Sequence, residues 1–291
     1  SRKYVLSCTF YGLIKGLNLG QGAFHMRRYK QIEYKAGITI EVIKCIPRGS
    51  RKGEQRQPVK KKTKEEIREA NARQAARKLM RKVNANFRPG DWHVVLTYPK
   101  GERPTPAEAR GHIKTFLRKL RDEYKKHGLE LKYIQATEYL NKAIHHHIII
   151  NNVNDGKETS LQYVNRIWGS ITKGHPKYVP LYDEGEYRKL ADYFVKETDK
   201  TFRNEDSPTK QRYSCSRNLK EPNVSHRINT TKNGWMMIPR PRPGYYIIPD
   251  TLYNGEDKLG YPYQRYVMVK LNPTDKDWEP CSNWGEEDEY E

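Results

Sequence analysis

The chain has 291 residues, with 55 lysines and arginines against 35 aspartates and glutamates, so its formal net charge is +20. Eight acidic residues and one lysine fall in residues 275–291, and residues 1–274 therefore carry a charge of +27. A body this basic favours a polyanionic partner, most often nucleic acid, over a charge that serves solubility alone. The length allows a sizeable hydrophobic core, although a mean hydropathy of −1.00 indicates that much of the chain is surface.

Cysteine spacing and hydropathy argue against several protein classes. The four cysteines lie far apart with no CxxC pair, which argues against zinc ribbons and disulfide scaffolds and suits a reducing cytoplasm. No apolar run approaches the roughly 20 residues of a membrane span, and the start has no signal-peptide pattern. We therefore expect a soluble, cytoplasmic protein with no membrane partner. The 21 tyrosines suit stacking of unpaired bases, but tyrosine is also a common strand residue.

The first predicted elements are a hairpin and a basic loop. Residues 28–46 alternate apolar and polar positions around an Ala36-Gly37 turn. Residues 44–64 then hold nine basic residues, one acidic residue and no apolar periodicity, which is typical of a mobile loop. This loop is either an arm that contacts phosphates or a solvated connector. Its candidate DNA-binding residues are Arg48, Arg51, Lys52, Lys60, Lys61 and Lys62.

Two helices with clear start signals flank a buried strand. Thr63 and Glu66 have capping-box spacing, which predicts a helix from there to about residue 85. The run WHVVLTY at 92–98 predicts a buried strand. A second capping box at Thr105 and Glu108 opens a helix with one apolar face, and Gly128 ends it.

The following segments complete an α+β pattern. Strands at 129–139 and 144–151 are expected to pair across a short turn, before a helix at 161–168, a short KYVPLY strand and a helix at 186–197. From residue 87 the order is strand, helix, strand, strand, helix, strand, helix. This order predicts a central antiparallel or mixed sheet with helices packed on it, and short tyrosine-rich strands follow residue 199.

A histidine triplet lies in the second of the two paired strands. Side chains alternate along a strand, so His145 and His147 share one face and His146 has the other. Two imidazoles on one face of a rigid strand can bind a single metal ion, and a tight hairpin would bring Glu138 beside them. Two histidines and one carboxylate leave coordination positions open, as a catalytic metal requires. The alternatives are a surface histidine cluster or satisfied core histidines.

The sequence YFVK at 193–196 supplies a candidate nucleophile. Positions i and i+3 of a helix share a face, so Tyr193 and Lys196 can reach the same phosphate. A tyrosine hydroxyl that attacks a phosphodiester forms a phosphotyrosine link, and the lysine could stabilise the developing charge. Taken alone, this pattern is also that of an ordinary amphipathic helix.

Together these motifs resemble those of a known superfamily. VLTY at 95–98, the triplet His145–His147 and the helix with Tyr193 and Lys196 occur in the order of the three motifs of the HUH endonucleases. More narrowly, the chain is similar to the rolling-circle replication-associated (Rep) proteins of phages and mobile elements of Gram-positive bacteria. The resemblance covers roughly residues 29–273 and includes TKEEIREANARQAARKLMRKVNANF, RYSCSRNLKEP and GYPYQRYVMVKLNP. In this chain the middle residue of the triplet is a histidine rather than a plainly hydrophobic residue.

The resemblance implies a sheet that presents His145, His147 and Glu138 to a Mg²⁺ or Mn²⁺ ion. It also implies that Tyr193 cuts one strand of a single-stranded or hairpin origin DNA, stays on the 5′ phosphate and frees a 3′ hydroxyl, with Lys196 as its helper. No second tyrosine lies one helical turn from Tyr193, which favours a one-tyrosine enzyme. The expected segments are an N-terminal region at 1–86, a nuclease domain at 87–235, a tyrosine-rich extension at 236–274 and an acidic tail at 275–291.

Partners and alternatives follow from what the sequence lacks. There is no GxxxxGK[ST] phosphate loop, so a host helicase would unwind the DNA and a host polymerase would extend it, in a bacterial cytoplasm. A relaxase or a single-tyrosine transposase would use the same chemistry for another task. A non-catalytic protein that binds single-stranded DNA through its basic, tyrosine-rich surface is the alternative from another class.

Overall fold

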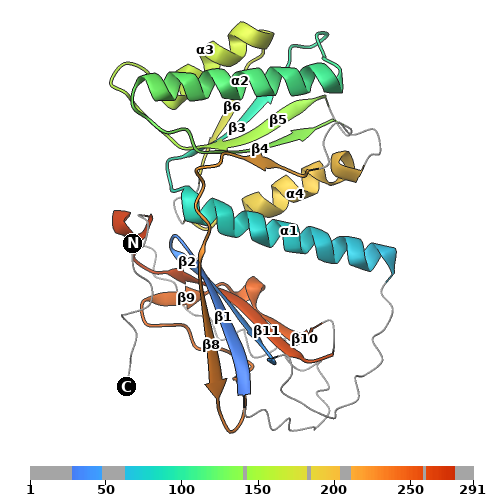
Figure 1. Ribbon diagram of the computed structural model, residues 1–291, viewed down its shortest axis with the longest axis vertical. Coiled ribbons are helices and arrows are strands. Elements are labelled where there is room, and N and C mark those ends of the chain that lie inside the picture. Colours follow the sequence, from blue (N-terminus) through green and yellow to red (C-terminus); the bar gives the residue numbers. More distant parts are fainter. Residues whose placement is uncertain are drawn as a thin grey trace.

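The computed structural model describes residues 28–47, 63–139, 143–181, 185–203, 211–257 and 260–278. This part of the chain is α+β and contains two antiparallel sheets and four α-helices. Figure 1 shows the five-stranded sheet with its helices at one end of the molecule and the other sheet at the opposite end. Helix α1 (Lys64–Asn86) crosses between the two.

The five-stranded sheet contains the histidine triplet. Its order is β6-β3-β5-β4-β7, so β5 lies in the centre, and every pair of neighbours is antiparallel. The strands are β3 (Trp92–Thr97), β4 (Tyr133–Glu138), β5 (His145–Ile150), β6 (Lys177–Pro180) and β7 (Ser214–Cys215). The expected pairing of the two strands around the triplet is therefore confirmed.

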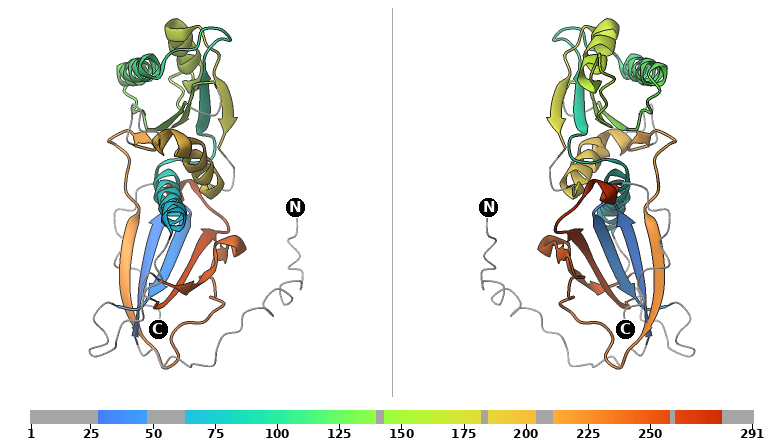
Figure 2. Two further views of the ribbon diagram at one scale, coloured as in Figure 1. Left: turned by 90° about the vertical axis from the view of Figure 1, so that its right-hand side faces the viewer. Right: turned by 90° about the vertical axis from the view of Figure 1, so that its left-hand side faces the viewer.

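Helices cover both faces of this sheet. Helices α2 (Pro106–Lys126) and α3 (Ser160–Thr172) pack on one face, and α4 (Arg188–Arg203) lies on the other, between the sheet and α1 (Figures 1 and 2). The order β3-α2-β4-β5-α3-β6-α4 is the one that the sequence predicts from residue 87. Both predicted capping boxes are present, with Thr63 and Thr105 each accepting a hydrogen bond from the backbone of the glutamate three residues on.

The six-stranded sheet joins the two ends of the described chain. Its path is β10-β11-β2-β1-β8, and β9 also pairs with β11. The strands are β1 (Arg28–Ala36), β2 (Thr39–Cys45), β8 (Asn223–Thr230), β9 (Tyr245–Ile247), β10 (Tyr253–Glu256) and β11 (Pro262–Lys270). The N-terminal hairpin is thus held between strands that come after α4.

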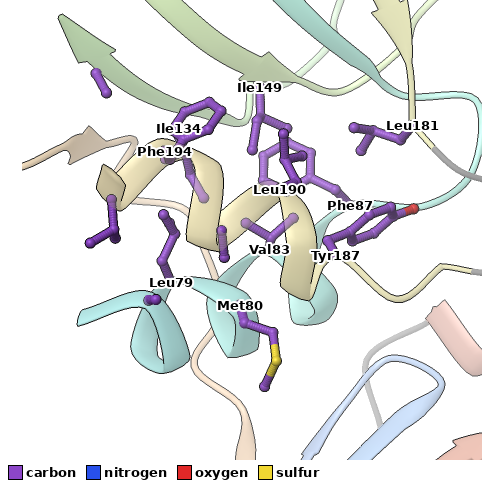
Figure 3. Close-up of a cluster of buried hydrophobic side chains, with 14 of the residues drawn as sticks. Leu79, Met80, Val83, Phe87, Ile134, Ile149, Leu181, Tyr187, Leu190 and Phe194 are labelled. Carbon is purple, nitrogen blue, oxygen red and sulfur yellow. The ribbon is translucent and has the colours of Figure 1, made fainter. Parts of the chain in front are cut away.

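Strand alternation divides the residues of the five-stranded sheet between two cores. Ile148 and Ile150 of β5 face α2 and α3, where the buried cluster includes Phe116, Tyr163 and Trp168. Ile149 points to the opposite side, into a cluster formed with α1 and α4. Figure 3 shows Leu79, Met80 and Val83 of α1 and Leu190 and Phe194 of α4 in this cluster, below Ile134 and Ile149 of the sheet. Burial of these side chains fixes α4 against the same face of the sheet.

A buried asparagine connects α4 to α1 and the hairpin. The Asn84 side chain donates a hydrogen bond to the Thr39 hydroxyl (3.0 Å) and accepts one from the Tyr187 backbone amide (3.1 Å). Tyr187 immediately precedes α4, so Asn84 satisfies one of the backbone donors that a helix leaves free at its start. Gly37 is required beside it, because its φ of 55° suits glycine and a Cβ would lie 2.4 Å from the Asn84 carbonyl oxygen.

Some predictions fall on residues that the structure does not describe. The basic segment with Arg48, Arg51, Lys52 and Lys60 to Lys62 lies outside the described residues, as does the acidic tail beyond Trp278. At the start of that tail, residues Asp275–Trp278 form a short 3₁₀ helix. Among the described helices, none combines the length and the apolar character needed to cross a membrane.

Candidate active site

The three predicted metal ligands lie together on the face of the sheet that α4 covers. Glu138 at the end of β4 pairs in register with His145 at the start of β5. One ligand atom each from Glu138, His145 and His147 can be chosen so that all lie within 4.8 Å of one another. All three side chains are buried, and Glu138 is fully so. The parity of the strand brings together the residues that it predicts.

The donor set fits a divalent cation. The Nδ1 of His145 lies 2.7 Å from the Ala143 carbonyl oxygen, which can only accept, so Nδ1 carries the hydrogen and Nε2 presents its lone pair. That Nε2 lies 3.3 Å from a Glu138 carboxylate oxygen. Ligand bonds of about 2.1 Å place neighbouring ligands roughly 3–3.5 Å apart, so this pair is spaced as two ligands of one ion. A buried carboxylate that faces a lone pair is stabilised when a cation lies between them.

A third histidine holds the ring of His147. The Nε2 of His93 on β3 lies 3.2 Å from Nδ1 of His147. Burial lowers the pKa of His93 to about 4, so this imidazole is neutral at pH 7 and one ring donates the shared hydrogen to the other. When His147 donates, its Nε2 keeps a lone pair for a metal. This is the usual arrangement of a metal-binding histidine and its outer partner.

His146 has a structural environment on the other face of the sheet. Its Nδ1 is 2.8 Å from the Thr137 hydroxyl and its Nε2 is 3.0 Å from the Tyr98 hydroxyl. The ring lies against Trp168, with centroids 5.6 Å apart. Burial lowers the pKa of His146 to about 3, so it is neutral and both ring nitrogens are used. His146 therefore points away from the Glu138–His145–His147 cluster.

Helix α4 places Tyr193 beside the cluster. The Tyr193 ring is nearly perpendicular to the His147 ring, with centroids 5.3 Å apart, and its centroid is 6.2 Å from that of the His93 ring. The next residue, Phe194, is buried and packs on both histidine rings, which orients this turn of α4. Tyr193 itself is 37% exposed. A tyrosine that is both next to the cluster and open to solvent can meet a large substrate.

The surroundings of Tyr193 keep its hydroxyl protonated. Burial, then Glu197, then Glu138 raise the pKa of Tyr193 above its ordinary value of about 10. Attack by this oxygen therefore needs positive charge nearby when a substrate is bound. Lys196 lies three residues on along α4 and is exposed, and within the described chain its side chain makes no hydrogen bond or ion pair. It is thus free to approach a bound phosphate.

Comparison with known proteins agrees with a role in replication. Residues 91–202, which span β3 to α4 and contain the whole cluster and Tyr193, match a family model for replication-associated proteins of the ORF2 type. Searches of curated proteins and of solved structures gave no significant match. The family match supports a replication-associated, Rep-like protein.

Sequence analysis did not single out His93. Its signal was present, because a lone histidine in the run WHVVLT has the parity of Val95 and Thr97. In the sheet His93 is opposite Ile149 and Val95 is opposite His147, so His93 and His147 are diagonal neighbours on one face. The register of β3 against β5, which local patterns do not give, is what makes His93 part of the site.

Proposed function

We propose that this chain is a metal-dependent DNA-nicking endonuclease of the HUH type, which cuts single-stranded or hairpin origin DNA to start rolling-circle replication. The observation that carries the proposal is the position of Tyr193, exposed to solvent and 5.3 Å from His147 of a buried two-histidine, one-carboxylate cluster. The match to a replication-associated family and the charge of +27 over residues 1–274 support DNA as the substrate.

In this proposal Glu138, His145 and His147 hold a divalent cation. When bound, Mg²⁺ or Mn²⁺ supplies Lewis-acid polarisation of the scissile phosphate. The neutral His93 keeps His147 oriented, and the carbonyl of Ala143 does the same for His145. The fully buried position of Glu138 limits access of water to its carboxylate.

Tyr193 acts as the nucleophile. Its hydroxyl oxygen forms a bond to the scissile phosphorus, the bond from phosphorus to the 3′ oxygen breaks, and the tyrosine proton is replaced by the new phosphodiester link. The departing 3′ oxygen takes up a proton and becomes the 3′ hydroxyl that primes synthesis. Lys196, one turn along α4, neutralises charge that develops on the phosphate. The covalent link conserves the energy of the broken bond for later rejoining.

The experiment is a search for a covalent adduct. The protein is incubated with a pool of random single-stranded DNA and Mn²⁺, and denaturing electrophoresis detects a band that resists SDS. We expect the band with wild type and its loss with Tyr193→Phe, which removes one hydroxyl from a partly exposed ring. Sequencing the attached DNA then gives the preferred site.

Tyr187→Phe is the matched control. Tyr187 is fully buried in the core between α1 and α4, six positions before Tyr193 (Figure 3), so its loss of one hydroxyl should leave the adduct intact. An adduct that persists in Tyr193→Phe would overturn the assignment of the nucleophile. DNA binding without an adduct under any divalent metal would favour the non-catalytic binding protein. Adduct formation at transfer or transposon ends instead of an origin would favour the relaxase or transposase.

A further inference from the structure

We propose that single-stranded DNA reaches the candidate active site along a basic groove between α2 and residues 211–218, on the outer edge of β4. This inference rests on the proposed function, because it takes single-stranded DNA as the substrate. It assigns a binding path to residues that neither the metal cluster nor the basic segment at 48–62 includes.

The groove consists of two adjoining cavities of about 290 and 740 Å³. Each is bounded by α2, by β4 and by the chain around β7, and Tyr133 lines both. The basic side chains that line them are Arg110, Lys114, Arg121, Lys125, Arg212 and Arg217. Among the described residues that line this surface, Glu130 is the acidic one, so the groove is strongly positive.

The cations of α2 form a stripe along the groove. Arg110, Lys114, Arg121 and Lys125 are spaced by four, seven and four residues, which places them on one face of the helix. At 1.5 Å per residue the stripe is about 22 Å long. Within the described chain, Lys114, Lys125 and Arg217 make no ion pair, whereas Arg212 is paired with Asp199. Unpaired cations on one face can neutralise successive phosphates.

The smaller cavity meets the candidate active site. Thr137 and Tyr139, the neighbours of Glu138, both line it, and so does Thr198 of α4. The cavity therefore spans the edge of the sheet from the α2 face to the α4 face, where the metal cluster lies. The sheet leaves this edge open, since β7 pairs with β4 only at Ile134 and Gln135 among the described residues.

The groove is suited to a single strand. Tyr139 and Tyr213 line the smaller cavity as half-buried rings, and burial raises the pKa of each, so both stay neutral. Neutral rings beside a positive track are the combination that binds unpaired bases without strong sequence preference. A duplex is too wide for a cavity of about 290 Å³ between a helix and a sheet edge.

The test compares two double variants that remove the same charge from α2. Lys114→Gln with Arg121→Gln changes the groove, and Arg118→Gln with Lys119→Gln changes exposed cations of α2 that line neither cavity. Both are made in the full chain carrying Tyr193→Phe, without added metal, so that cleavage does not contribute. Binding of a fluorescent thymidine homopolymer is measured by anisotropy at several salt concentrations.

We expect the groove variant to lower the log–log salt slope by about 1.4, at about 0.7 for each phosphate contact on a single strand, and the control to keep the slope of its parent. Equal slopes for the two variants would overturn the groove, as would an equal loss with duplex DNA of the same length. Because binding is measured without cleavage, a wild-type protein that forms no adduct would defeat the proposed function and leave this result standing.

Discussion

The imidazoles of His93 and His147, 54 residues apart in the chain, meet with their ring nitrogens 3.2 Å from each other. The contact leaves one face of His147 to the cluster and the other to a neutral, buried partner. His93 touches neither Glu138 nor His145 through any hydrogen bond that the described residues show. It is therefore a positioning residue, whose effect should be seen first in metal affinity.

We expect His93→Leu to weaken Mn²⁺ binding by about 10- to 100-fold, because the outer partner that orients His147 is lost while its volume is kept. Calorimetric titration with Mn²⁺ measures the affinity, and circular dichroism checks the fold. His93→Asn, which can still hydrogen-bond, should recover part of the affinity. A Leu variant with wild-type affinity would show that His147 is held by its strand alone.

The triplet should divide by face. His145→Ala and His147→Ala should each abolish Mn²⁺ binding and adduct formation, because each removes one of three ligands. His146→Ala should keep Mn²⁺ binding and lose stability, by about 2–4 kcal/mol, since it leaves a cavity and removes the partner of the Tyr98 and Thr137 hydroxyls. Metal titration and urea unfolding separate the two effects. Equal loss of metal affinity in all three variants would contradict the strand parity.

Asn84→Ala should destabilise the protein by about 2–3 kcal/mol. The change strands the buried Tyr187 amide and removes one partner of the Thr39 hydroxyl. Urea unfolding measures the loss as a lower midpoint. Asn223→Ala, at an exposed position of β8, should stay within about 0.5 kcal/mol of wild type. If both variants unfold at the wild-type midpoint, Asn84 does not join α4 to the hairpin.

The basic segment at 48–62 gives a prediction that rests on sequence. Replacing its seven basic residues by glutamine should lower the salt slope of single-strand binding by about 0.7 for each phosphate contact that is lost. Base preference should not change, because phosphate contacts position a strand without reading it. Anisotropy titrations with the same homopolymer measure the slope, and the unchanged chain length controls for connectivity. An unchanged slope would make the segment a solvated connector.

Much of the fold and of the site was present in local sequence. Capping boxes at Thr63 and Thr105 set the starts of α1 and α2, because the cap uses only residues within one turn. Strand alternation put His145 and His147 on one face and His146 on the other, because side chains in a strand follow a period of two. The hairpin of β4 and β5 brought Glu138 to the same place, since the pairing depends on a short connection.

Only the tertiary structure decided which distant elements meet. The hairpin at the start of the described chain pairs with β8 and β11, from beyond α4, and nothing in its alternation names those partners. His93 joins the site through the register of β3 on β5, and Tyr193 through the packing of Phe194 and Leu190 against the sheet and α1. Local patterns record which side of an element is apolar. Burial of those sides against one another, which depends on the whole chain, decides that Tyr193 lies beside His147.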